Sequence, residues 1–249
     1  MNSNTGVLFG RLMRGILRSP DTIITVAVTP IMMLLLFVYV FGGAIETGTD
    51  SYVNYLLPGI LLITIASGVA YTSHRLFTDV KSGLMARFST MPIKRSSILW
   101  AHVLTSLVSN LLAVIVVILV ALLMGFRSGA DMLEWLAVIG VLVLFMLALT
   151  WLAVIPGLTA DSMEGATAYS YPLIFLPFIS SAFVPTETMP TIVRVFAENQ
   201  PVTSIVNAIR ALLYGGTVGS EIWISLAWCV GIMGFAYLIA SKIFKRQLG

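Results

Sequence analysis

Cysteine, histidine and charged residues are all scarce in this sequence. It has 14 Lys and Arg and 11 Asp and Glu in 249 residues, with one cysteine, Cys229, and two histidines, His74 and His102. A single cysteine excludes an internal disulfide and a multi-cysteine metal site. The sequence also lacks a His-Glu-x-x-His pair, a Gly-x-Ser-x-Gly elbow and a Gly-x-x-x-x-Gly-Lys-Ser/Thr loop, which argues against a zinc protease, a serine hydrolase and a P-loop ATPase. We therefore expect no enzyme activity, no metal and no cofactor in this chain.

The few charges lie between six long stretches that have none. The chain is 58% hydrophobic and 10% charged, whereas a soluble domain has about 25% charged residues. About 20 apolar residues, at 1.5 Å rise per residue, cross a ~30 Å hydrocarbon layer as a helix. We predict an all-α integral membrane protein with one membrane domain, residues 22–246, and six transmembrane helices at about 23–43, 53–73, 97–124, 134–156, 167–184 and 222–242.

Lys and Arg are distributed unevenly around these spans. With six spans, both termini share one side, and that side carries eleven of the 14 cations. Short loops rich in Lys and Arg stay in the cytoplasm. We therefore expect both termini in the cytoplasm. The single cysteine and the compact six-span plan favour the cytoplasmic (inner) membrane of a prokaryote. The three cations on the opposite side are Arg127, Arg194 and Arg210.

Two cytoplasmic segments have amphipathic patterns. In residues 1–21, apolar residues recur every four positions beside Arg11 and Arg14, which predicts a helix in the membrane interface; it is either a topology anchor or a connecting helix. In residues 74–95, another four-residue repeat predicts a short helix with Gly83 inside it, ended by Pro92. This second segment is either a basic loop that sets orientation or a protruding helix that docks a cytoplasmic partner.

The external segment after the fifth span is rich in proline. Residues 184–190 form a proline-bracketed turn region, and Pro201 then opens an apolar stretch with helical spacing. The Gly215-Gly216 pair stops that helix, and Arg210 lies near its C-terminus, where a cation is favoured. A helix of this length is too short to span the membrane. It therefore lies in the outer interface or enters the membrane and returns.

Four pieces of the sequence carry a family resemblance. Residues 55–60, followed by 83–95, then 184–190 and 201–210, resemble the ABC transporter type-2 permeases in order and spacing, most closely the daunorubicin-resistance-like drug exporters. The resemblance implies a half-transporter, in which two six-span permeases, identical or related, pair with two cytoplasmic ATPase subunits. It also implies alternating access driven by ATP binding in the partner. Nucleic acid is not an expected partner.

The resemblance also implies roles for particular segments. Residues 1–21 would be the connecting helix, about 79–91 the coupling helix in the ATPase groove, and Thr191–Tyr214 a re-entrant element closing the exit. The coupling residues would be Asp79, Lys81, Gly83, Arg87, Phe88, Pro92, Lys94 and Arg95. Plain anchoring by positive charge remains the alternative for Arg87, Lys94 and Arg95. The external gate residues would be Pro185, Pro190, Pro201 and Arg210.

The cargo path is placed at the seam between two permease copies. Phe175, Phe178 and Phe183 are candidates to line it, with lipid contact or packing as the alternative for each. Because no charged cluster lies within the spans, we expect a hydrophobic or amphipathic cargo, such as a drug or antibiotic, and not a small ion. Export of a lipid-linked polysaccharide or lipo-oligosaccharide remains open within the family. An intramembrane enzyme or a non-transporting scaffold are the alternatives outside it.

Overall fold

The computed structural model describes residues 3–17, 20–42, 52–89, 95–216 and 219–247. Every regular element in these ranges is a helix, so the prediction of an all-α protein is confirmed for the part that is described. The elements are α1 (Ser3–Leu17), α2 (Pro20–Leu36), η1 (Phe37–Phe41), α3 (Tyr52–Lys81), α4 (Leu84–Ser89), α5 (Arg95–Leu123), α6 (Met132–Thr159), α7 (Met163–Ala168), α8 (Ser170–Phe175), η2 (Leu176–Ile179), η3 (Thr186–Thr188), α9 (Thr191–Asn199), α10 (Pro201–Tyr214) and α11 (Glu221–Gln247).

Within the described ranges, four helices are long and apolar enough to cross a membrane. They are Tyr52–Lys81, Ser96–Leu123, Met132–Thr159 and Glu221–Arg246. In the region expected as the first span, α2 continues directly into η1, and a shorter apolar stretch covers Val28–Phe41. Four spans are therefore seen directly where the sequence predicts six.

The region expected as the fifth span, 167–184, is not one continuous helix. It contains the end of α7, then α8 and η2, and the backbone becomes extended at Ser180. Pro172 lies in α8 and Pro177 in η2. A proline has no backbone N–H to donate and restricts the residue before it, so two prolines five positions apart interrupt a long helix.

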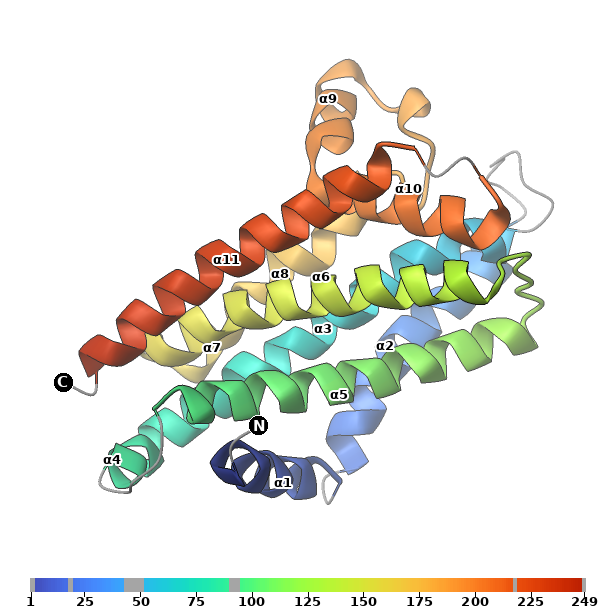
Figure 1. Cartoon of the computed structure of the whole chain (residues 1–249). Coiled ribbons are helices and arrows are strands. Elements are labelled where there is room, and N and C mark those ends of the chain that lie inside the picture. The colour runs from blue at the N-terminus through green and yellow to red at the C-terminus, as the bar shows by residue number, and fades with distance from the viewer. Residues whose placement is uncertain (1–2, 18–19, 43–51, 90–94, 217–218, 248–249) are drawn as a thin grey trace.

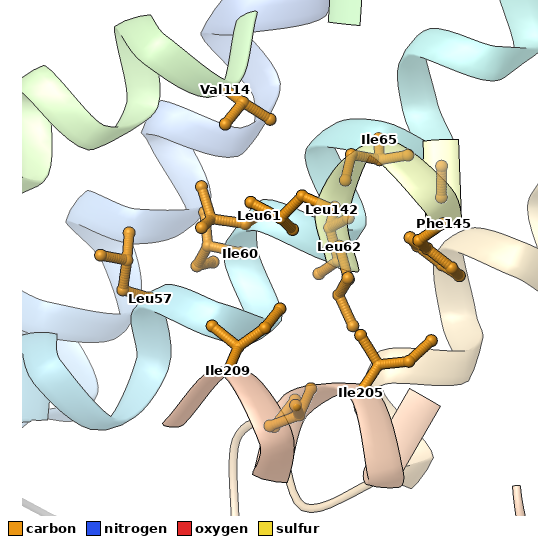
Figure 2. Close-up of a cluster of buried hydrophobic side chains, with 14 of the residues drawn as sticks. Leu57, Ile60, Leu61, Leu62, Ile65, Val114, Leu142, Phe145, Ile205 and Ile209 are labelled. Carbon is orange, nitrogen blue, oxygen red and sulfur yellow. The ribbon is translucent and has the colours of Figure 1, made fainter. Parts of the chain in front are cut away.

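Helix α3 is at the centre of the bundle. In its most apolar stretch 83% of the residues are buried, against 17% for α11, which runs along the outside. Figure 2 shows the packing around α3, where Leu57, Leu61 and Ile65 meet side chains from α5, α6 and α10. A helix buried on all sides has little free surface to move, and α3 is therefore the frame on which the other elements are placed.

A second apolar cluster holds the short helices to one end of the bundle. It contains Leu8 of α1, Leu76 of α3, Phe88 of α4, Ile98 of α5 and Phe244 of α11. Figure 1 shows α1, α4 and both ends of the chain at this end, and α9 and α10 at the other. The small helices at each end are thus packed against the long ones.

At the other end of the bundle, α3 lies so close to the segment at 180–184 that an added methyl group should reduce stability. A Cβ added at Gly59 of α3 would lie 2.6 Å from the Cβ of Ala182. That atom is attached directly to the backbone, so Gly59→Ala must push α3 away from the segment at 180–184. We expect the free energy of unfolding to fall by roughly 1–3 kcal/mol, the usual cost of overpacking, measured by unfolding in mixed detergent–SDS micelles.

Gly140→Ala in α6 is the matched control for Gly59→Ala. A Cβ at Gly140 meets nothing within 4 Å, and alanine is the better helix former. Equal stability of the two variants would show that α3 and the 180–184 segment are not in close contact.

Candidate functional site

An ion cluster around Asp79 joins three helices at the end that holds both termini. Asp79, near the end of α3, accepts a hydrogen bond of 2.6 Å from Nη2 of Arg11 in α1, and its Oδ2 lies 3.3 Å from Nε2 of His102 in α5. The side chains are 40% exposed for Arg11, 18% for Asp79 and 1% for His102. The cluster therefore runs from the surface into the bundle, and it fixes α1 in position.

A chain of polar side chains continues from this cluster into the bundle. Arg75, one turn before Asp79, donates to Oγ1 of Thr72 at 3.5 Å, and Thr72 donates to Oγ of Ser106 at 2.5 Å. Asn110 and Thr150 also donate to that Ser106 oxygen, at 3.3 and 3.4 Å. Hydrogen bonds between helices in an apolar surrounding hold the helices together. This chain links α3, α5 and α6 over about two further turns.

Gly83 separates α3 from α4. It has φ of +71°, a conformation that favours glycine over other residues. The prediction of one helix with Gly83 inside it is therefore wrong: α3 ends at Lys81 and α4 begins at Leu84. The apolar residues of the four-residue repeat still pack together on both sides of Gly83, because Leu76 and Phe88 belong to the same apolar cluster.

The other proposed coupling residues divide into buried and exposed ones. Phe88 of α4 is buried, and the Arg11 guanidinium lies 5.6 Å from its ring centroid. Lys81 and Arg87 are exposed, and the Lys81 ammonium lies 5.5 Å from the ring of Phe77.

Three further residues complete the proposed coupling set. Arg95 is the first residue of α5, while Pro92 and Lys94 lie outside the described residues. Arg11 contacts both Asp79 and Phe88, and so joins α1 to α3 and α4.

At the other end, Arg210 joins α10 to α3. Its guanidinium lies 3.9 Å from the ring centroid of Tyr55, and its Nη2 donates to the carbonyl oxygens of Tyr55 and Ser181 at 3.1 and 3.0 Å. The Tyr55 hydroxyl donates to the same Ser181 oxygen at 3.0 Å, and Asn207 accepts from Arg210 and from the Ser181 hydroxyl. This arginine is therefore a structural clamp between three segments of the chain.

The prolines expected near the gate mark the starts of helices. Pro185 precedes η3, Pro190 precedes α9, and Pro201 is the first residue of α10. Each takes a position where a missing backbone donor costs little.

The three phenylalanines expected on the cargo path do lie together. The rings of Phe178 and Phe183 stack at 4.8 Å, and Phe175 lies 6.1 Å from Phe178. Phe37 of η1 joins them, 4.8 Å from Phe183. Phe183 is buried and Phe175 is exposed, so the cluster extends from the interior to the surface between η1 and η2.

A hydroxyl-rich groove lies beside α3. It has a volume of about 300 Å³ and lies between α3 and the α7–α8 region, with Ser67, Tyr71, His74, Thr167 and Tyr171 among its lining. The hydroxyl groups and the His74 imidazole all offer hydrogen bonds. An arrangement of this kind suits binding of a polar part of a small molecule.

Comparison with known proteins identifies the family of this chain. The profile of the ABC-2 type transporter family matches residues 3–214, which include both end clusters and the phenylalanines. The chain belongs to this family. It is thus a multi-pass membrane subunit of an ABC transporter, a class whose permease subunits are generally not enzymes.

Several ABC-2 relatives are named as resistance proteins. A daunorubicin resistance ABC transporter permease protein of Streptomyces coeruleorubidus is 26% identical over 241 residues, covering 95% of this chain and 84% of the relative. A probable doxorubicin resistance ABC transporter permease protein of Mycobacterium tuberculosis is 27% identical over 229 residues, covering 89% and 81%. A putative transport permease of Porphyra purpurea is 26% identical over 252 residues, covering 97% and 84%.

The partners of the two key charged residues were not identified from the ABC-2 sequence. Arg11 lies 68 positions before Asp79, and Tyr55 lies 155 positions before Arg210. A single sequence carries no signal that links positions so far apart. His102 is buried, and its Nε2 faces Asp79, while its Nδ1 has no hydrogen-bond partner among the described residues.

Proposed function

We propose that this chain is the permease of an ATP-driven exporter that moves a hydrophobic or amphipathic compound outward. The observation that carries the proposal is the match to the ABC-2 family over residues 3–214, together with relatives named for drug resistance. In this proposal two copies of a six-span permease form the membrane path, and separate cytoplasmic ATPase subunits supply the energy. Both termini face the cytoplasm of a prokaryotic cell.

The proposed route of coupling passes through α4. Its exposed residue Arg87 meets the ATPase, while Phe88 on the same helix is buried against α1 and α5. Arg11 connects that apolar contact to Asp79 and hence to α3. A force on α4 therefore reaches the central helix through packed and ion-paired side chains. The switch requires that ATP-bound partners contact one permease state better than the other.

The proposed cargo has a planar or otherwise bulky apolar part and a few polar groups. The phenylalanine cluster supplies an apolar surface, and the hydroxyl groove supplies hydrogen bonds. The names of two relatives, which refer to daunorubicin and doxorubicin resistance, agree with such a compound. An aromatic drug is therefore the first substrate to test.

The test of the whole proposal is purification of the tagged chain from native membranes in mild detergent, with a search for an ATPase that purifies with it. We expect an ATPase that is lost when residues 83–91 are scrambled. A chain that inserts and folds normally but brings down no ATPase would refute the exporter proposal and favour a scaffold.

A single substitution tests the coupling surface. We expect Arg87→Glu to insert normally but to reduce ATP-dependent export at least several-fold, because it reverses the charge that faces the ATPase. Export is measured in vesicles with a fluorescent aromatic drug. Arg14→Glu is the matched control, since Arg14 is an exposed arginine of α1 whose side chain bonds only to the Gly10 carbonyl among the described residues. Normal export by the Arg87 variant would show that Arg87 is not part of the coupling surface.

A further inference from the structure

An aromatic cavity of about 370 Å³ lies where α5 begins and α11 ends. Trp100 of α5, Trp151 of α6 and Tyr237 of α11 form its wall, with Trp151 in the middle. The Trp151 ring lies edge-on to the other two, with centroids 5.3 Å from Trp100 and 4.8 Å from Tyr237. Trp151 is buried, but Trp100 and Tyr237 remain exposed. The wall therefore faces the outside of the bundle.

Positive charge and hydroxyl groups border the same cavity. Lys242 and Lys245 lie on α11 after Tyr237, and at 1.5 Å rise per residue Lys242 is ~7 Å further along the helix axis. Ser96 and Ser241 also line the cavity, and no Asp or Glu does. Among the described residues, neither lysine has an ion-pair or hydrogen-bond partner. The cavity is thus aromatic on one side and cationic toward the end of α11.

Simpler roles explain each half of this cavity but not the combination. Lysines at the end of a membrane helix set orientation and favour the helix C-terminus. Trp and Tyr are common where a membrane meets water. Neither role requires that three rings from three helices form one wall beside two unpaired lysines. An amphiphile with an apolar chain and an anionic head matches both halves at once.

We propose that this cavity binds one anionic phospholipid from the adjacent leaflet. An acyl chain lies against Trp100, Trp151 and Tyr237, and the phosphate lies between Lys242 and Lys245. Attraction of an anionic membrane lipid to a lysine at this depth is worth about fivefold in affinity per lysine. The site lies on α5, α6 and α11, apart from the hydroxyl groove and the phenylalanine cluster, and does not depend on the identity of the cargo.

Tryptophan quenching tests this proposal directly. The protein, with Trp135, Trp223 and Trp228 replaced by Phe so that only Trp100 and Trp151 report, is placed in nanodiscs of unlabelled phosphatidylcholine. Phosphatidylglycerol or phosphatidylcholine with brominated chains is then added in increasing amounts. We expect half-maximal quenching at a several-fold lower fraction of brominated phosphatidylglycerol. Native mass spectrometry of the unaltered chain, counting retained phosphatidylglycerol against phosphatidylcholine, gives a second measurement if the triple replacement does not fold.

Charge variants identify the site and its ligand. The double variant Lys242→Gln with Lys245→Gln should lose the preference for phosphatidylglycerol, while Lys81→Gln with Arg14→Gln, two exposed cations at the same end, should keep it. Equal quenching by the two lipids, or an unchanged preference in the Lys242 and Lys245 variant, would overturn the proposal in favour of general lipid contact. Displacement of the lipid by millimolar inorganic phosphate or glycerol 1-phosphate would show a free-phosphate site and would also overturn it.

Discussion

Asp79→Ala should lower the free energy of unfolding by roughly 2–3 kcal/mol. The change leaves Arg11 and the buried His102 without the carboxylate that they share. Leaving a buried donor such as the His102 imidazole N–H without its acceptor costs about 1–3 kcal/mol, and losing a half-exposed ion pair such as that of Arg11 costs less than about 1. The expected value combines these two losses. Unfolding in mixed detergent–SDS micelles measures the loss.

The same variant should release α1 from the bundle. Arg11 is the one residue in α1 for which the structure records an ion pair, among the residues it describes. Without that pair, trypsin should cut at Arg11 or Arg14 in the folded protein at least several times faster. Asp161→Ala is the matched control, because Asp161 is an exposed acid with no recorded ion pair in the described part of the chain. Unchanged trypsin cleavage in the Asp79 variant would show that apolar packing alone holds α1.

Arg11→Ala shows how much of the effect of Asp79→Ala comes from the Arg11–Asp79 ion pair. If the two residues act through one another, the double variant of Arg11 and Asp79 should be less destabilised than the sum of the single variants. Purely additive effects would mean that Asp79 stabilises the protein mainly through His102.

Local signals in the sequence located several elements of this fold. Pro201 and Gly215, for example, bound α10, because proline suits a first turn and glycine suits the left-handed conformation after a last turn. The scarcity of charge indicated the long apolar helices, because the burial of a charge in lipid costs free energy. Each of these signals depends on a residue and its immediate surroundings.

The interruptions of the helices depend on backbone conformation, which composition does not reveal. The charge-free stretch at 165–186 reads the same whether its helix is continuous or interrupted at Pro172 and Pro177. The four-residue repeat around Gly83 likewise continues through a break, because both sides of the break pack into one apolar cluster. Hydropathy measures the preference for lipid and is insensitive to these interruptions.

The residues that join distant helices were the hardest to identify. Asp79 and Arg210 stood out as charges near apolar segments, but their structural partners come from other helices. For Arg210 those partners are mainly backbone oxygens, which no residue type reveals. The contacts of Arg210 make it a clamp between α10 and two other segments of the chain.

Arg210→Ala should lower the free energy of unfolding by roughly 3 kcal/mol. It removes charge-assisted hydrogen bonds to the carbonyl oxygens of Tyr55 and Ser181, each worth about 1.5–3 kcal/mol, and a cation–π contact worth about 1–2. These contributions overlap, since one guanidinium makes them all, so the total is smaller than their sum. Arg210→Lys should recover part of the loss, because a lysine keeps the charge but cannot donate two ways from a planar group.

Arg194→Ala is the matched control for this clamp. Arg194 lies on α9 at the same end of the molecule, and its pair with Glu198 at 2.7 Å is exposed on both sides, by 45% and 41%. Such an exposed pair contributes little to stability, so the control should remain close to the unaltered protein in SDS unfolding. If Arg210→Ala is no more destabilised than Arg194→Ala, then apolar packing holds α10 against α3 and the guanidinium is dispensable. If the large difference is found, the attachment of α10 at this end of the bundle depends on one side chain that reaches to two other segments of the chain.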